Sequence, residues 1–234
     1  MNFAWERLGD GVHRCRVPFL DVTVGLVQGS SATLLIDTGT TLAEARAIQA
    51  DVASFTGRSV SYIILTHNHF DHILGSSAFL DAAVYCAPEV ATTMSAYTEL
   101  LRSDAIRHGA NADEVDAAIA ALRTPGHRVR QAVVDLGDRM VSISHPGRGH
   151  TGHDLIVIVP DRSRTVVFCG DLVEESGDPV VDSNSDVAAW PITLDHVLEA
   201  GGPDAVLVPG HGAVVGAAFV RRQQSWLRGY AAGR

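Results

Sequence analysis

The stretch VSYIILTHNHFDH, residues 60–72, decides the fold of this 234-residue chain. Its first half, residues 60–65, is an apolar run typical of a strand that is buried on both faces. Its second half places three histidines and an aspartate within six residues, directly after that strand: His67, His69, Asp71 and His72. Because open α/β sheets place their sites at the carboxyl ends of strands, this order predicts an α/β protein with a polar site there.

The donor atoms in this turn point to a metal. Imidazole and carboxylate together suit zinc or iron, and no cysteine stands nearby to form a thiolate site. The plainer alternative is a polar turn whose histidines only form hydrogen bonds, but four potential ligands this close together rarely arise from packing alone. Two tetrahedral metals need more donors than this turn supplies, so further ligands must come from elsewhere in the chain.

Three further donors stand beside glycines later in the sequence. His150 lies in GRGHTG before a predicted strand, Asp171 follows an apolar strand in CGD, and His211 follows another in PGHG. Small residues let the backbone approach a metal closely. Each donor alone is weak evidence, whereas the ordered set indicates one shared site.

Alternating and helical hydrophobic spacings predict the elements around these donors. Strands are expected over residues 11–17, 22–28, 32–36, 60–65, 82–86, 129–135, 140–144, 155–159, 165–169 and 205–208. Helices are expected over 42–55, 193–199 and 215–230, and residues 88–122 indicate a mostly helical insertion broken near Gly109. The many small and polar residues of 170–191 predict a long loop. With no internal repeat or linker, we expect a single domain over residues 1–234.

Composition narrows the class of partner. The net charge of −9 and the lack of a long basic run disfavour a nucleic-acid partner. No segment has the roughly 20 consecutive apolar residues that cross a bilayer, and the first residues do not resemble a signal peptide. Three cysteines at wide spacing do not indicate a disulfide framework. We therefore expect a cytoplasmic protein with a small-molecule substrate, no membrane partner and, at most, self-association as a homodimer.

The order of these donor residues along the chain resembles that in a known family. Asp37 in DTG, the HxHxDH run at 67–72, His150, Asp171 and His211 resemble the motifs of the metallo-β-lactamase superfamily, over nearly the whole chain. The resemblance implies an αββα sandwich of two mixed β-sheets flanked by helices, with metals in a shallow groove at one edge of the sheets. It also implies a metal-dependent hydrolase.

The resemblance further implies two zinc ions per chain, with iron or manganese as alternatives. The first zinc would be bound by His67, His69 and His150, the second by Asp71, His72 and His211, and Asp171 would bridge both. A hydroxide shared by two metals is present near neutral pH and attacks a carbonyl or phosphoryl centre. Asp71 would also act as the catalytic residue that orients this nucleophile. Asp37 would support the ligand loops without touching a metal.

Departures from the named branches of this superfamily restrict the substrate. The best-known β-lactamases carry cysteine at the position of Asp171 and lysine at that of Glu174, and homoserine-lactone lactonases carry tyrosine at the latter. Glyoxalase II enzymes continue into a helical glutathione-binding domain, whereas 23 residues follow His211 here. RNA-processing members need basic surfaces. We therefore expect hydrolysis of an ester-, lactone- or thioester-like small molecule, with β-lactam hydrolysis at most a side activity.

Residues 172–191 form an acidic loop that is a candidate substrate contact. Glu174 would disfavour an anionic substrate, and Trp190 would either line the pocket or begin the next helix. A solvated surface loop is the plainer interpretation of these residues. His153, three residues after His150, is a further candidate for the groove, and Cys169 is expected to face the core.

Two other classes of function stay open on these residues. Persulfide dioxygenases resemble the same ligand set but use a single iron, so the motif does not by itself establish two zinc ions. Non-catalytic binding modules of the same fold usually lose ligands, whereas all the ligand positions are filled here. Metal analysis and a substrate screen separate these alternatives.

Overall fold

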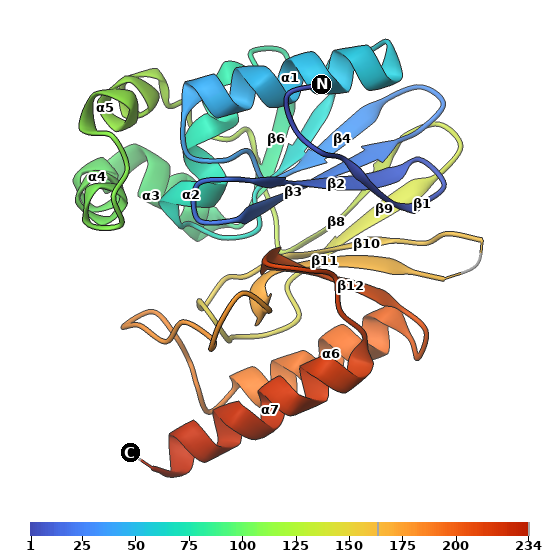
Figure 1. The fold of residues 1–234 in the computed structure, drawn as a ribbon, viewed down its shortest axis with the longest axis vertical. Helices are drawn as coiled ribbons and strands as arrows, with labels where there is room; N and C mark the ends of the chain where they lie inside the picture. Colours follow the sequence, from blue (N-terminus) through green and yellow to red (C-terminus); the bar gives the residue numbers. More distant parts are fainter. Residues whose placement is uncertain (163, 234) are drawn as a thin grey trace.

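Two layers of β-sheet lie face to face at the centre of the molecule, and helices cover both outer faces (Figure 1). The computed structural model describes residues 1–162 and 164–233. The first layer is built from β1 (Glu6–Gly9), β2 (Val12–Val17), β3 (Val22–Gln28), β4 (Thr33–Ile36), β5 (Tyr62–Ile64), β6 (Ala83–Cys86) and β7 (His127–Arg128). The second is built from β8 (Gln131–Asp135), β9 (Met140–Ser144), β10 (Ile156–Val159), β11 (Val166–Glu174) and β12 (Val206–His211).

Both layers mix parallel and antiparallel pairs. In the first layer β1 to β4 pair antiparallel and β4 to β7 pair parallel. In the second layer β8 to β11 pair antiparallel, and β11 and β12 pair parallel. The expected αββα arrangement of mixed sheet and flanking helices is confirmed. The two layers are nevertheless hydrogen-bonded into one continuous sheet, because β12 pairs with β3 at His211 and Val22.

Helix α1 (Leu42–Thr56) covers the first layer (Figure 1). It begins with a capping box in which the Thr41 hydroxyl accepts from the backbone N–H of Glu44 and the Glu44 carboxylate accepts from that of Thr41. It ends at Gly57, whose φ of 70° is the left-handed conformation that favours glycine at a helix end. The sequence signals at both ends therefore account for the limits of this helix.

Helices α6 (Trp190–Gly201) and α7 (Ala217–Ala232) cover the second layer (Figure 1). The alternating side chains of β11 explain how this layer is buried on both faces. Val166 and Phe168 belong to the large core that both layers share, whereas Val167 and Cys169 pack with α6 and α7. Cys169 thus faces the core, as expected. None of the helices in the described ranges is both long and apolar enough to cross a membrane.

The helical insertion consists of α3 (Pro88–Ala96), α4 (Thr98–Arg107) and α5 (Ala112–Ala121). Gly109, with a φ of 94°, stands in the expected break between α4 and α5. Helix α4 contacts α2 (Phe70–Ile73), which carries the second half of the histidine-rich turn and continues into a 3-10 turn at Leu74–Ala78. The insertion therefore lies beside the predicted site.

Two differences from the predicted elements concern that site. Strand β11 runs to Glu174, so that Asp171 and Glu174 lie on a strand instead of in a loop. Its pairing with β12 shifts register around Gly170, which breaks the alternation by which a strand is recognised in a sequence. Helix α6 begins at Trp190, earlier than predicted, because Pro191 occupies the first turn, where a missing N–H costs nothing. The short strands β1 and β7 were also missed.

Candidate metal centre

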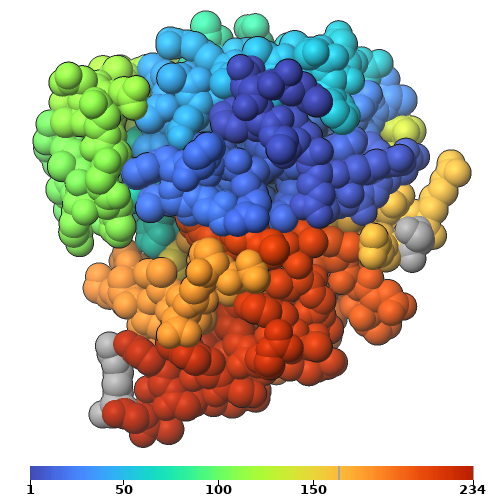
Figure 2. Space-filling model, viewed as in Figure 1, coloured from blue at the N-terminus to red at the C-terminus, as the bar shows by residue number. Residues whose placement is uncertain are grey.

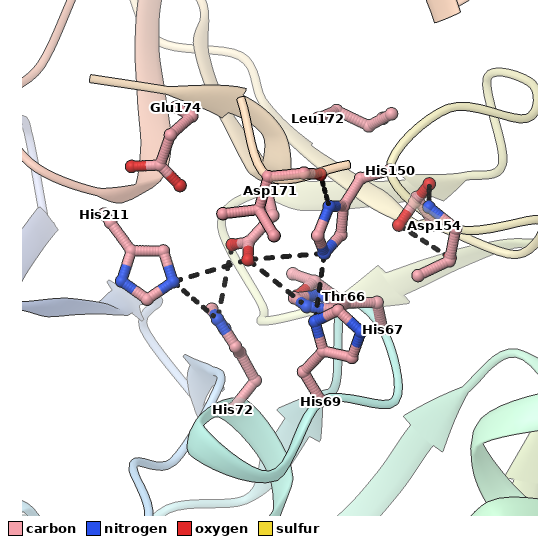
Figure 3. A network of polar contacts seen from close by, with 12 residues as sticks. Thr66, His67, His69, His72, His150, Asp154, Asp171, Leu172, Glu174 and His211 are labelled. Carbon is pink, nitrogen blue, oxygen red and sulfur yellow. Dashed lines mark hydrogen bonds and ion pairs between the residues drawn. The ribbon is translucent and has the colours of Figure 1, made fainter. Parts of the chain in front are cut away.

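The predicted ligands converge at the edge where the two layers meet (Figure 3). The first layer supplies the turn after β5 and the start of α2, with His67, His69, Asp71 and His72. The second layer supplies His150 from the turn before β10, Asp171 from β11 and His211 from the end of β12. These side chains come from segments far apart in the sequence, and they face one another.

The first donor group consists of His67, His69, His150 and Asp171. One nitrogen or oxygen atom from each of these residues lies within 4.8 Å of the others. Nε2 of His150 lies 3.0 Å from Nδ1 of His69. Oδ2 of Asp171 lies 3.5 Å from Nε2 of His67 and 3.5 Å from Nε2 of His150. His67, His69 and His150 are the residues expected to hold the first metal, and Asp171 is the residue expected to bridge both metals.

The second donor group consists of Asp71, His72 and His211, whose donor atoms also lie within 4.8 Å of one another. Nε2 of His211 is 3.3 Å from Nε2 of His72 and 3.4 Å from Oδ2 of Asp71. Asp171 reaches this group as well, because its Oδ1 lies 3.3 Å from Nε2 of His72 and its Oδ2 lies 3.3 Å from Nε2 of His211. Asp171 therefore stands between the two groups.

The buried atoms of this cluster fit a metal. Nε2 of His67 and Oδ1 of Asp171 are buried and form no hydrogen bond within the described part of the chain, an arrangement that is unfavourable unless something else satisfies those atoms. Imidazole nitrogens with carboxylate oxygens form a donor set that suits zinc. Space for Asp171 depends on Gly210, since a Cβ there would lie 1.8 Å from Oδ1 of the aspartate.

Asp37 lies behind the second donor group and belongs to neither group. Its Oδ2 is 2.9 Å from Nδ1 of His72, and its two oxygens accept from the backbone N–H and the hydroxyl of Thr66. The residue is buried and has a φ of 59°, in the left-handed region that aspartate and asparagine adopt more readily than most other residues. The contact holds the imidazole of His72 with Nε2 toward the centre.

His69, His150 and His211 also contact residues that belong to neither donor group. Nδ1 of His150 is 3.3 Å from the carbonyl oxygen of Val180, and Nδ1 of His211 is 2.8 Å from that of Leu20. Nε2 of His69 is 3.8 Å from Oδ2 of Asp182, a residue of the loop after β11. Such partners fix which ring nitrogen faces a metal. The roles of Leu20, Val180 and Asp182 could not be predicted from the sequence, because a single contact from a distant loop leaves no local motif.

The two donor groups differ in their affinity for protons. In the first group, burial lowers the pKa of His67 and lowers that of His150 to about 4. In the second group burial also opposes the charged form, but the carboxylates of Asp171 and Asp71 outweigh it. They raise the pKa of His72 well above its ordinary value and that of His211 to about 10.

Glu174 is buried at the wall of the centre, with its carboxylate near Asp171 and His211 (Figure 3). Its Oε1 accepts from the backbone N–H and the hydroxyl of Ser176. Burial and, next, the charge of Asp171 raise the pKa of Glu174 to about 7. Glu174 also lines the open cavity, which has a volume of about 430 Å³ and contains Asp71, His69 and His211 in its wall.

Trp190 and His153 do not line this cavity. Trp190 is fully buried, and its indole N–H donates to the carbonyl oxygen of Leu172 at 2.9 Å while its ring lies 5.7 Å from that of His150. Of the two roles that the sequence left open for Trp190, the structure shows the second, since the residue begins α6. His153 is 7% exposed and belongs to neither donor group.

The fold and these two donor groups together define a class of protein. The sequence model of the metallo-beta-lactamase superfamily matches residues 17–211, and the chain belongs to that superfamily. Members of this superfamily are metal-dependent hydrolases, and this chain is therefore a metal-dependent hydrolase. Two related proteins have names that describe a thioesterase and a hydrolase.

Two such relatives have names that describe a substrate. Acyl-coenzyme A thioesterase MBLAC2 of Gallus gallus is 26% identical over 95% of this chain and 85% of its own length. Hydroxyacylglutathione hydrolase of Acidiphilium cryptum is 30% identical over 53% of this chain and 48% of its own length. Both similarities are low, so they support the class of reaction more strongly than a particular substrate.

Solved structures share the fold. The metallo-beta-lactamase FIM-1 from Pseudomonas aeruginosa aligns with a TM-score of 0.75 at 18% identity, over 98% of this chain and 96% of its own. The metallo-beta-lactamase from Pontibacter korlensis aligns with a TM-score of 0.73 at 19% identity, over 97% and 99% of the two chains. Identities this low show a common architecture alone.

Proposed function

We propose that this enzyme uses two zinc ions to hydrolyse an acyl thioester of a small thiol. The observation that carries the proposal is the position of Asp171, whose carboxylate contacts imidazoles of both donor groups. Seven buried or half-buried donors that share one carboxylate suit a pair of ions better than a single ion. When bound, such a pair lowers the pKa of water and polarises a carbonyl oxygen.

The residues that would hold each ion follow from the two groups. His67, His69 and His150 would hold the first ion, Asp71, His72 and His211 the second, and Asp171 would contact both. The contacts of Asp37 and of the carbonyl oxygens of Leu20 and Val180 keep three of these imidazoles in place before any ion binds. The chain thus supplies a prearranged cavity, which lowers the reorganisation required during the reaction.

Asp71 is the residue proposed to orient the attacking water. It lies on α2 with its carboxylate at the cavity wall, and it is only 5% exposed. A carboxylate in this position can accept a hydrogen bond from a water in the cavity and set the direction of its lone pair. The neighbouring Oδ2 contact with His211 restricts the rotation of the Asp71 side chain.

The charges around the cavity favour a substrate that is uncharged near the carbonyl group. Glu174, Asp178 and Asp182 all line the cavity, and Arg107, which lines it as well, is paired with Asp104 at 3.0 Å. Thioesters are preferred over other esters because both named relatives act on an acyl group carried by coenzyme A or glutathione, which are thiols. A thiol of pKa about 8.5 also departs as an anion more readily than an alcohol does.

The first experiment combines metal analysis with a substrate panel. Protein purified without added metal is expected to contain zinc, rising to two ions per chain after zinc is supplied, and to release thiol from acyl thioesters. Chelation should abolish this release, and zinc should restore it. One equivalent of iron per chain, together with oxygen consumption on a persulfide, would instead support the mononuclear dioxygenase alternative and contradict the proposal.

A further inference from the structure

A side groove opens from the metal cavity between α4 and the loop at 175–189. Its volume is about 480 Å³, and it shares four lining residues with the cavity: His69, Asp104, Arg107 and Asp182. The two spaces therefore adjoin, and the groove lies beside a predicted metal ligand. In Figure 2 the helical insertion (green) and this loop (orange) lie on the same side of the molecule.

One wall of the groove is apolar and unusually exposed. Tyr97, which ends α3, and Leu100 on α4 line the groove and are 51% and 65% exposed. Leu101 lies beside them and is buried. Large apolar side chains that are exposed next to a catalytic cavity mark a surface that a ligand covers.

The opposite wall is polar and held firmly. It consists of Asp182, Ser183 and Asn184, and Oδ1 of Asp182 accepts from the backbone N–H of Asn184 at 2.7 Å. Ser185 ties this segment to the metal centre, because its hydroxyl donates to the carbonyl oxygen of His150 at 2.9 Å. The backbone of this segment is thus tied down, and the side-chain amide of Asn184 and the hydroxyl of Ser183 offer hydrogen-bonding groups on it.

The charged groups of the groove do not favour an anion. Arg107 lies 3.0 Å from Oδ1 of Asp104, so the cation at the junction is already paired. Asp182 adds a negative charge beside His69. A ligand that is elongated and uncharged, with an apolar side and hydrogen-bonding amides, would match both walls, whereas a plain alkyl chain would leave the polar wall without partners.

We propose that this groove binds the thiol arm of the substrate, an uncharged amide-bearing chain of the pantetheine type, while the acyl group lies in the main cavity. This inference rests on the proposed thioesterase function and specifies its substrate. Methyl and methylene groups of the arm would pack on Tyr97 and Leu100, and its amides would bond with Ser183 and Asn184. The thioester carbonyl would then reach the centre beside His69.

The test compares two acetyl thioesters that differ only in the thiol. Wild-type enzyme is expected to hydrolyse S-acetylpantetheine with a higher kcat/KM than S-acetylethanethiol, which has no amides. In Leu100→Ala the ratio of these two kcat/KM values should fall about fivefold, because apolar contact with the arm is lost. Leu80→Ala is the matched control, since Leu80 is 68% exposed and lies outside the groove, and it should keep the wild-type ratio.

A binding measurement tests the groove without turnover. S-ethylpantetheine, a thioether that lacks the carbonyl group, should bind to the zinc-loaded enzyme in calorimetry, and Leu100→Trp, which fills the groove, should abolish that binding. Equal kcat/KM for the two thioesters, or unchanged binding in Leu100→Trp, would overturn the groove assignment. Failure of every thioester to react would contradict the proposed function instead, and the thioether would still decide whether the groove binds the arm.

Discussion

The two donor groups share Asp171 and lie side by side, but they hold protons differently. The first group has two imidazoles, His67 and His150, whose pKa is lowered by burial. The second group has two imidazoles, His72 and His211, whose pKa is raised by nearby carboxylates. Because a metal binds the neutral imidazole, the first position is ready for an ion near neutral pH, whereas the second must release protons first.

This contrast has a structural cause. Oxygen atoms of Asp37, Asp71 and Asp171 lie within 3.6 Å of the imidazole of His72. Among residues 1–162 and 164–233, the oxygen partners of the His150 imidazole at similar distances are Asp171 and the backbone carbonyl of Val180. Carboxylates that strengthen metal binding at a position therefore also favour the protonated form of the imidazoles there. We expect the two ions to load in sequence, the first position before the second.

Replacing Asp71 should have the largest effect. Asp71→Ala removes both a ligand of the second position and the group proposed to orient water, so kcat/KM should fall by about 10²–10⁴-fold. Metal content should fall to one zinc per chain, held by the first group. Both quantities come from thiol-release kinetics and metal analysis of the same sample. Unchanged turnover with two bound ions would show that neither role belongs to Asp71.

Acidification should weaken the second position more than the first. The pKa of His72 is raised well above its ordinary value and that of His211 to about 10, so each imidazole is protonated below its raised pKa and loses that proton as the pH rises through it. If binding displaces one proton, zinc affinity at the second position should fall about tenfold per pH unit, or about 100-fold from pH 8 to pH 6. Competition with a chromogenic chelator at both pH values measures each affinity. Equal losses of zinc affinity at the two positions would contradict the difference in proton affinity between the two donor groups.

Asp37→Asn should act on the second position alone. Asparagine tolerates the left-handed backbone of this residue, but it does not carry the charge that faces His72. Zinc affinity of the second position should fall about 10- to 100-fold, while the first position keeps its affinity. Chelator competition again gives both values, and circular dichroism confirms that the variant folds. A loss confined to the first position would refute this assignment.

Asp182→Asn should produce the smallest effect, at the first position. The carboxylate lies 3.8 Å from Nε2 of His69, so its influence is weaker than that of Asp37 on His72. Zinc affinity of the first position should fall about tenfold. Asp178→Asn removes the same charge from the same loop without a contact to a histidine and should leave zinc affinity unchanged. Equal effects of the two variants would mean that loop charge alone is responsible.

Residues close together in the sequence were the most predictable part of the centre. The strand before His67 and the spacing of His67 and His72 follow from local hydrophobicity and donor chemistry. The three later donors were recognised from their glycine-rich turns beside predicted strands, and the family resemblance assigned them to the two metal positions. The sequence could not decide the role of Trp190, because an aromatic residue in a polar stretch has the same appearance whether it lines a cavity or fills a core. Periodicity ended β11 too early, since the register shift around Gly170 interrupts the alternation of its side chains.

The outer contacts could not be predicted for a different reason. Leu20 acts through its backbone carbonyl, so the identity of its side chain carries no signal for the contact with His211. Its φ of 56°, and that of 60° at Asp21, place that carbonyl, yet neither residue is a glycine that would mark a turn in the sequence. Asp182 is one of several acids in its loop, and only the folded chain shows which one approaches His69.

The pairing of His211 with Val22, where β12 joins β3, has a consequence for how the enzyme is made. Ligands from the first layer are synthesised early, whereas His211 follows His67 by 144 residues. Closing so long a loop is opposed by chain entropy and relies on the completed sheet. We therefore expect the complete donor set to form only once β12 has joined the sheet, and ions bound there would stabilise the folded chain against unfolding.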